Sequence, residues 1–139
     1  MKKCLWSILL AVALACTSCD NANKIFPVSG KVIYKGSPAA GATVFFQRCG
    51  GDRVNQQTVM GIVQEDGSFT LVCGHLGKGA PPGEYDVLIE WRERPNRAKG
   101  LAHKTPDRLK GRFADPKRPR FQAVVHAEAN NLPPFELTD

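Results

Sequence analysis

The chain has 139 residues, and its 19 Lys and Arg residues outnumber its 13 Asp and Glu residues, for a formal net charge of +6. This length suits one domain. The positive charge alone would fit nucleic acid, a membrane surface, an acidic partner or plain solvation, and the N-terminal residues decide among these classes.

The N-terminus has the pattern of an export signal. Two lysines follow Met1, and the mostly apolar run Cys4–Ala15 is shorter than the roughly twenty apolar residues that span a bilayer. The segment ending at Cys16 resembles a bacterial lipobox, with small residues before the cysteine that becomes acylated. Cys19 is a weaker acylation site, and plain secretion is the other alternative. Export argues against nucleic acid as a partner.

These features predict three regions. Residues 1–15 form a lipoprotein signal peptide, residues 16–25 a lipidated tether that begins at Cys16, and residues 26–139 one domain. The protein would be exported and anchored to a membrane of the bacterial cell envelope, in the periplasm or on the cell surface.

Seven short runs rich in β-branched and aromatic residues are separated by clusters of Gly, Pro, Asn and Asp, and there is no helical period. They predict an all-β fold, a seven-stranded antiparallel β-sandwich. The expected strands are Phe26–Tyr34, Ala42–Arg48, Thr58–Gln64, Ser68–Cys73, Glu84–Trp91, Phe121–Glu128 and Leu132–Thr138.

Alternation within these runs predicts the buried face of each strand. In the fifth run, Tyr85, Val87, Ile89 and Trp91 point one way, with charged residues opposite. The expected core is Val32, Val44, Phe69, Leu71, Tyr85, Val87, Ile89, Val124 and Phe135. Asp66-Gly67 predicts a hairpin with a type I′ turn, which needs positive φ at both central residues.

One connection interrupts this regular spacing. Arg92–Arg120, here called the basic loop, has no periodicity and holds eleven cations and three anions. A connection of that length without structure usually signals function or disorder. Counting strands across the sandwich places it at the end opposite the lipidated N-terminus. The expected partner-binding residues are Arg108, Lys110, Arg112, Lys117, Arg118 and Arg120.

Three kinds of partner suit this loop. Phosphates and carboxylates of an anionic envelope polymer match arginine through bidentate contacts, another envelope protein is the second candidate, and the facing membrane is the third. A loop whose cations only keep the protein soluble is the alternative.

Three motifs are the most specific in the chain: G-x-P-x-x-G-A-x-V at Gly36–Val44, DG-x-F-x-L at Asp66–Leu71, and PPGEY at Pro81–Tyr85. With the tail Leu109–Leu137, they resemble small bacterial envelope lipoproteins built on the carboxypeptidase-regulatory-like domain, a transthyretin-like sandwich. The resemblance implies a binding or structural module without chemistry of its own. A runner-up is an accessory or docking domain for an exported enzyme or transporter.

The search for catalytic motifs supports the same expectation. His75, His103 and His126 lack the Glu spacing of a zinc peptidase, and no Ser lies in a Gly-x-Ser-x-Gly elbow. We therefore expect no enzyme activity, no metal and no cofactor.

Cys49 and Cys73 form a candidate disulfide. Exported proteins meet an oxidising compartment in which paired cysteines usually bridge. The strand count brings both cysteines to one end of the sandwich, which permits a bridge without proving it.

Mass spectrometry of the native N-terminus tests the export prediction. The expected result is a chain that begins at an acylated Cys16, because signal cleavage and acylation occur together at a lipobox cysteine. Recovery of the intact leader on soluble cytosolic protein would contradict the anchor and the compartment together.

Overall fold

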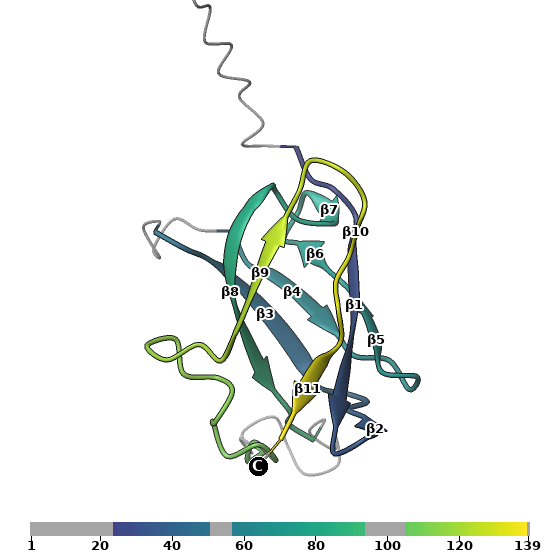
Figure 1. Cartoon of the computed structure of the whole chain (residues 1–139), viewed down its shortest axis with the longest axis vertical. Helices are drawn as coiled ribbons and strands as arrows, with labels where there is room; N and C mark the ends of the chain where they lie inside the picture. Colours follow the sequence, from purple (N-terminus) through teal and green to yellow (C-terminus); the bar gives the residue numbers. More distant parts are fainter. Residues whose placement is uncertain (1–23, 51–56, 94–104, 139) are drawn as a thin grey trace, which may run out of the picture.

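A computed structural model describes residues 24–50, 57–93 and 105–138. Within these ranges the chain is all-β, and two mostly antiparallel sheets pack as a sandwich without any helix (Figure 1). The predicted fold class is confirmed. The predicted signal peptide, Cys16 and most of the tether lie outside the described residues. No described segment forms a helix with the length and apolar character needed to cross a bilayer.

The five-stranded sheet is organised around β1 (Val28–Tyr34). The strand alternates buried Val28, Gly30 and Val32 with more exposed residues, as the period-two pattern predicts. It pairs with β2 (Ser37–Pro38), β5 (Ser68–Thr70), β10 (Asn130–Asn131) and β11 (Phe135–Leu137).

The six-stranded sheet has the order β7-β6-β4-β3-β8-β9, and all its neighbours are antiparallel. Its strands are β3 (Thr43–Arg48), β4 (Val59–Ile62), β6 (Val72–Cys73), β7 (Gly77–Lys78), β8 (Gly83–Glu90) and β9 (Phe121–Val125). The longest strand, β8, lies between β3 and β9 and ends at the basic loop.

The prediction that the strands pair antiparallel is wrong for β1 and the last two strands of the chain. β1 pairs in parallel with β10 and with β11, with Val32 opposite Phe135. A parallel pair requires a crossover connection, and here the chain crosses from β9 in the other sheet. Strand periodicity carries no information on the direction of the neighbouring strand.

The predicted strand Ser68–Cys73 is two strands in different sheets. β5 pairs with β1, whereas β6 pairs with β4, and the buried Leu71 lies at the corner between them. Such corners let one segment contribute to both layers of a sandwich.

The Asp66-Gly67 turn forms, but its predicted type is wrong. Only Gly67 has positive φ, at 83°. The Gly67 amide donates to the Gln64 carbonyl at 3.0 Å and the Gln64 amide to the Ser68 carbonyl at 2.7 Å. This pattern matches a type I turn followed by a left-handed glycine, the three-residue hairpin loop. Asp66 caps it by accepting from the Ser68 amide at 3.0 Å.

The core prediction is confirmed at eight of nine positions and wrong at Val124, which is 47% exposed while Val125 is 2% exposed. The reason is the register of β9 against β8. Ala123 lies opposite Tyr85, and directly opposed residues share a face of the sheet. Val125 therefore points inward with Tyr85, and Val124 points outward.

Aromatic rings connect the two layers. Phe46 of β3 contacts Phe69 of β5 at 6.5 Å between centroids, and Phe69 stacks on Phe135 of β11 at 6.1 Å. Phe135 in turn contacts Phe121 of β9 at 5.3 Å. Contacts of this kind add to the stabilisation from apolar burial.

Val125→Ala and Val124→Ala form a matched pair that tests the register of β9. Val125→Ala should lower the free energy of unfolding by about 2 kcal/mol, because it removes buried methyl groups and leaves a cavity. Val124→Ala should change it by less than about 0.5 kcal/mol. Denaturant unfolding of residues 24–139, which contain every described strand and are called the lipid-free form below, measures both. Equal losses would contradict the register.

Candidate functional site

The described parts of the basic loop are residues 92–93 and 105–120, and the loop starts at one end of the sandwich. In Figure 1 the described chain begins at the upper end, and the first part of the loop lies at the lower end near the C-terminus. The strand count predicted this opposition correctly for the described residues.

Two apolar side chains anchor residues 105–120 of the loop, so this part has a defined structure, contrary to the expectation. Leu109 is 1% exposed and Phe113 is 3% exposed, and both belong to the main core. Phe113 stacks on Phe121 with 5.9 Å between centroids. Burial of each side chain contributes about 2 kcal/mol, which offsets part of the entropy lost when the loop is ordered.

Backbone hydrogen bonds attach the same segment to the end of β8. The Ile89 amide donates to the Phe113 carbonyl, and the Arg108 amide donates to the Trp91 carbonyl, both at 2.8 Å. β9 pairs with β8 only from Gly83 to Val87, so the loop takes over the edge of the sheet where β9 is absent. The loop thereby protects polar backbone that a bare edge would expose.

Asp107 holds the turn at the start of this segment. Its Oδ1 accepts from the Trp91 amide at 2.8 Å and from the Leu109 amide at 3.1 Å, and its Oδ2 accepts from the Gly111 amide at 2.8 Å. Lys110 and Gly111 have positive φ values of 54° and 74°, which a tight turn requires. Asp107 therefore has a structural role, because its carboxylate holds the backbone of the loop.

The six predicted binding residues fall into two groups. Three of them have side chains that pack on the loop itself. The Arg108 guanidinium lies over the Trp91 ring at 4.2 Å, the Arg120 guanidinium lies over Phe113 at 5.3 Å, and the half-buried Arg112 donates from Nε to the Leu109 carbonyl at 3.4 Å.

The other three, Lys110, Lys117 and Arg118, are exposed, and no described carboxylate forms an ion pair with them. The Lys117 amide and the Arg118 amide donate to Asp115, at 2.9 Å to its Oδ1 and 3.1 Å to its carbonyl. The backbone is therefore held while the charged groups remain in water. The loop keeps these three cations accessible to an anionic partner.

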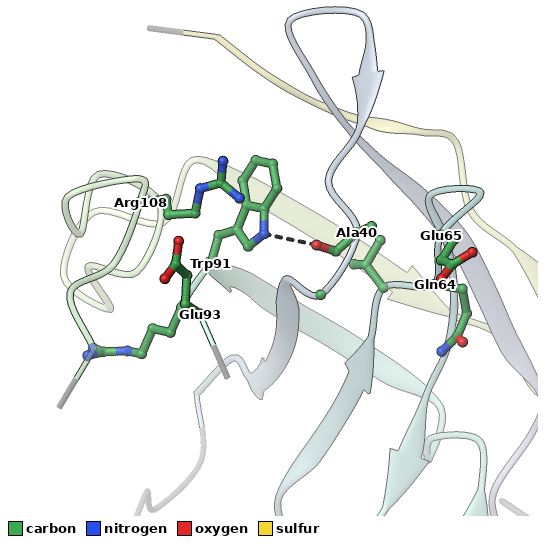
Figure 2. Close-up of a pocket in the computed structure, with 9 residues that line it drawn as sticks. Ala40, Gln64, Glu65, Trp91, Glu93 and Arg108 are labelled. Atoms are coloured by element: carbon green, nitrogen blue, oxygen red, sulfur yellow. Dashed lines mark hydrogen bonds between the residues drawn. The ribbon is translucent and has the colours of Figure 1, made fainter. Parts of the chain in front are cut away.

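A pocket of about 430 Å³ lies beside this loop (Figure 2). It is lined by Ala40, Gly41, Val63, Gln64, Glu65, Trp91, Arg92, Glu93 and Arg108. Figure 2 shows Trp91, Arg108 and Glu93 on one side of Ala40, and Gln64 and Glu65 on the other. The pocket therefore combines the β2–β3 connection, the turn after β4, the end of β8 and the basic loop.

Hydrogen bonds fix the pocket side chains on the loop side. The Trp91 indole donates from Nε1 to the Ala40 carbonyl at 3.0 Å, and its ring meets Tyr34 edge-on at 5.7 Å. Arg92 pairs with Glu90 at 2.8 Å and donates from Nη1 to the Thr105 carbonyl at 3.2 Å. Hydrogen bonding and charge attraction from Glu90 raise the pKa of Arg92 further above its usual value.

An apolar row crosses the outer face of the six-stranded sheet. Val72, Met60, Phe45 and Leu88 lie directly opposite one another on four neighbouring strands. Val72 is 41% exposed, and the nearby Ile62 is 44% exposed. Leu88 is only 5% exposed, so Val72 and Ile62 supply most of the exposed apolar surface there. Exposed apolar residues that cluster favour contact with another protein.

Side chains able to bind a metal do not gather in the described residues, which contain no group of three or more His, Cys, Asp or Glu positioned for an ion. His75 and His126 are both exposed, and His103 lies outside the described residues.

The expected Cys49–Cys73 disulfide is absent, and both cysteines are free thiols. Cys73 is buried on β6 and donates to the Gln57 Oε1 at 3.2 Å. Cys49 follows β3, and its amide bonds the Glu84 carbonyl of β8 at 3.0 Å. Cys73 lies opposite Val59 of β4, which lies opposite Phe46 of β3, so Cys49 is about 9.6 Å from Cys73 across the sheet and three residues further along it. This separation exceeds the roughly 7 Å that a disulfide permits.

Sequence reasoning missed Leu109 and Asp107 as structural residues and Trp91 as a pocket residue. A signal for the loop anchors exists in the sequence, because Leu109 and Phe113 are the apolar positions of a run otherwise rich in cations. No local signal brings Gln64 and Glu65 to Trp91, since that proximity depends on how the strands pair.

Comparisons with known proteins add little. No family model matches the chain, and no curated protein matches its sequence. The structure is similar to the crystal structure of a DUF3823 family protein from Parabacteroides merdae ATCC 43184, with 13% sequence identity and a TM-score of 0.44. The match covers 81% of this chain and 45% of that one, so this chain spans less than half of that protein. At this identity and TM-score the likeness assigns neither family nor function.

The two thiols should differ in reactivity. Burial raises the pKa of Cys73, and burial followed by the charge of Asp86 raises the pKa of Cys49. Because the thiolate is the reactive form, a maleimide should label the half-exposed Cys49 slowly at neutral pH and faster as the pH rises.

Cys73 should react only after unfolding. Mass measurement of the labelled lipid-free form, native and then denatured, should give one and then two labels. A nonreduced protein that takes up no label even when denatured would contradict the free thiols.

Proposed function

We propose that this chain is a non-enzymatic, lipid-anchored protein of the bacterial cell envelope that binds an anionic partner through its basic loop. The export pattern and Cys16 support the anchor. The β-sandwich agrees with the proposed relationship to carboxypeptidase-regulatory-like, transthyretin-like envelope modules. The proposal assigns no catalysis, no cofactor and no nucleic acid.

One observation carries this proposal: Lys110, Lys117 and Arg118 remain exposed on a backbone that the core holds in place. An ordered loop presents its charges without a large loss of conformational entropy on binding. The first part of residues 105–120 lies at the end away from the described start of the chain (Figure 1), which leaves that end open to a partner.

A second candidate function is an accessory or docking domain for an exported enzyme or transporter. The exposed Val72 and Ile62, at the end of the apolar row on the six-stranded sheet, favour it, because exposed apolar surface suits a protein more than a polyanion. Copurification from the native envelope separates the two functions, since a stoichiometric protein partner supports the second.

Binding of the lipid-free form to an immobilised polyuronate across a salt series tests the loop. Affinity should fall as sodium chloride rises from about 50 to about 500 mM, because salt screens exposed charges. Lys110→Glu, Lys117→Glu and Arg118→Glu together should lower affinity at least about tenfold. These positions avoid the packed Arg108, Arg112 and Arg120.

Lys24→Glu, Lys31→Glu and Lys78→Glu provide the matched control, since they reverse the same number of exposed charges outside the loop. The control should retain more affinity than the loop variant. An equal loss in both would mean that net charge, rather than the loop, accounts for binding. Neutral dextran should not bind through these charges.

A further inference from the structure

The pocket beside Trp91 combines apolar and polar groups. Ala40 and the Trp91 ring supply apolar surface over the buried Val63, and carboxylates, guanidinium groups and an amide supply the polar part of the lining. Its volume of about 430 Å³ is within the range of small-molecule sites. Such sites usually combine apolar surface with a few polar groups that orient the ligand.

Two rim donors are held in position before any ligand arrives. Arg108 is fixed twice, by the 2.8 Å bond from its amide to the Trp91 carbonyl and by its guanidinium over the indole at 4.2 Å. Arg92 is fixed by Glu90 and by the Thr105 carbonyl. Groups already ordered in the free protein lose little entropy on binding.

The charges that line the pocket balance, in contrast to those of the basic loop. Arg92, Arg108, Glu65 and Glu93 all line it, with Arg108 and Glu93 on one side of Ala40 and Glu65 on the other (Figure 2). A strongly anionic ligand would meet two carboxylates there, and a cationic ligand would meet two guanidinium groups. A neutral ligand that both donates and accepts hydrogen bonds uses all four.

A pyranose ring has these properties. Each hydroxyl donates and accepts, so neighbouring hydroxyls can give protons to a carboxylate and accept from a guanidinium in bidentate fashion. Its C–H face is apolar and suits the apolar surface of Ala40 and the Trp91 ring. We infer that this pocket binds a neutral sugar residue of a glycan.

This inference goes beyond the proposed function, because it needs neither the lipid anchor nor the exposed cations of the loop. The two can fail separately. Binding of a neutral sugar should be nearly independent of salt, whereas binding of a polyanion by the loop should weaken as salt rises.

Trp91 provides a direct readout. The chain has two Trp residues, Trp6 and Trp91, so the lipid-free form contains only the Trp of the pocket. We expect its fluorescence to change and saturate when at least one of the methyl glycosides of glucose, galactose, mannose and N-acetylglucosamine is titrated in. A dissociation constant on the order of 1 mM is typical for a ligand of that size.

Glu65→Gln and Glu93→Gln should each weaken binding about tenfold, because a charged hydrogen-bond acceptor is lost. Both side chains are exposed, so thermal unfolding should not change. Glu84→Gln is the matched control. Glu84 is exposed on β8, the strand that precedes Trp91, and does not line the pocket. This substitution should leave sugar binding unaltered.

Two results would overturn the inference. One is a Trp91 fluorescence that none of the four glycosides changes up to about 50 mM, far above the expected dissociation constant. The other is a response that Glu65→Gln, Glu93→Gln and Glu84→Gln all leave the same, because the sugar would then bind elsewhere.

Discussion

The sandwich depends on the space that two glycines leave for one aromatic ring. A Cβ on Gly30 of β1 would lie 2.8 Å from the Phe69 Cζ, and a Cβ on Gly61 of β4 would lie 3.3 Å from its Cδ2 and 2.8 Å from the Thr70 carbonyl oxygen. Real Cβ atoms essentially never approach other heavy atoms to less than 3.0 Å, so a side chain at either position would force a neighbour to shift. Because both positions lack a side chain, the ring fits between a strand of each sheet, and the two layers close around it. Larger residues at either position would force the sheets apart or displace Phe69 from the core.

The same ring connects the core to the candidate site. Phe69 stacks on Phe135, Phe135 contacts Phe121, and Phe121 stacks on Phe113 of the basic loop. The loop is therefore ordered by apolar packing, although its composition is mainly cationic. Arg108 and Arg120 take part in that packing through the faces of aromatic rings, while Lys110, Lys117 and Arg118 do not. The same segment thus carries two groups of cations, one that packs on aromatic rings and one that a partner can reach. Through Arg108 it also lines the pocket.

Much of the fold was predictable because alternation has a direct physical meaning. Val28, Gly30 and Val32 are buried, as are Tyr85, Val87 and Ile89, since a strand with one face on a core repeats every two residues. Val124 and Val125 are adjacent and both apolar, so alternation does not show which of them points inward. The prediction placed Val124 in the core, whereas Val125 is the buried residue. The loop anchors were missed because two apolar residues in a cationic run do not define an element. The free Cys49 and Cys73 were not predictable either, since the strand count gives the end of the sandwich at which a residue lies but not its distance across the sheet.

The all-β class, the approximate positions of the main strands and the turn residues can be read from the sequence, because they follow from contacts between residues close together in the chain. The assignment of β5 and β6 to different sheets, the parallel pairing of the last strands with β1, and the meeting of Ala40, Glu65, Trp91 and Arg108 at one pocket are visible only in the folded chain. These features depend on which strand lies beside which. That choice is made by the packing of the whole core around Phe69, and no local pattern encodes it.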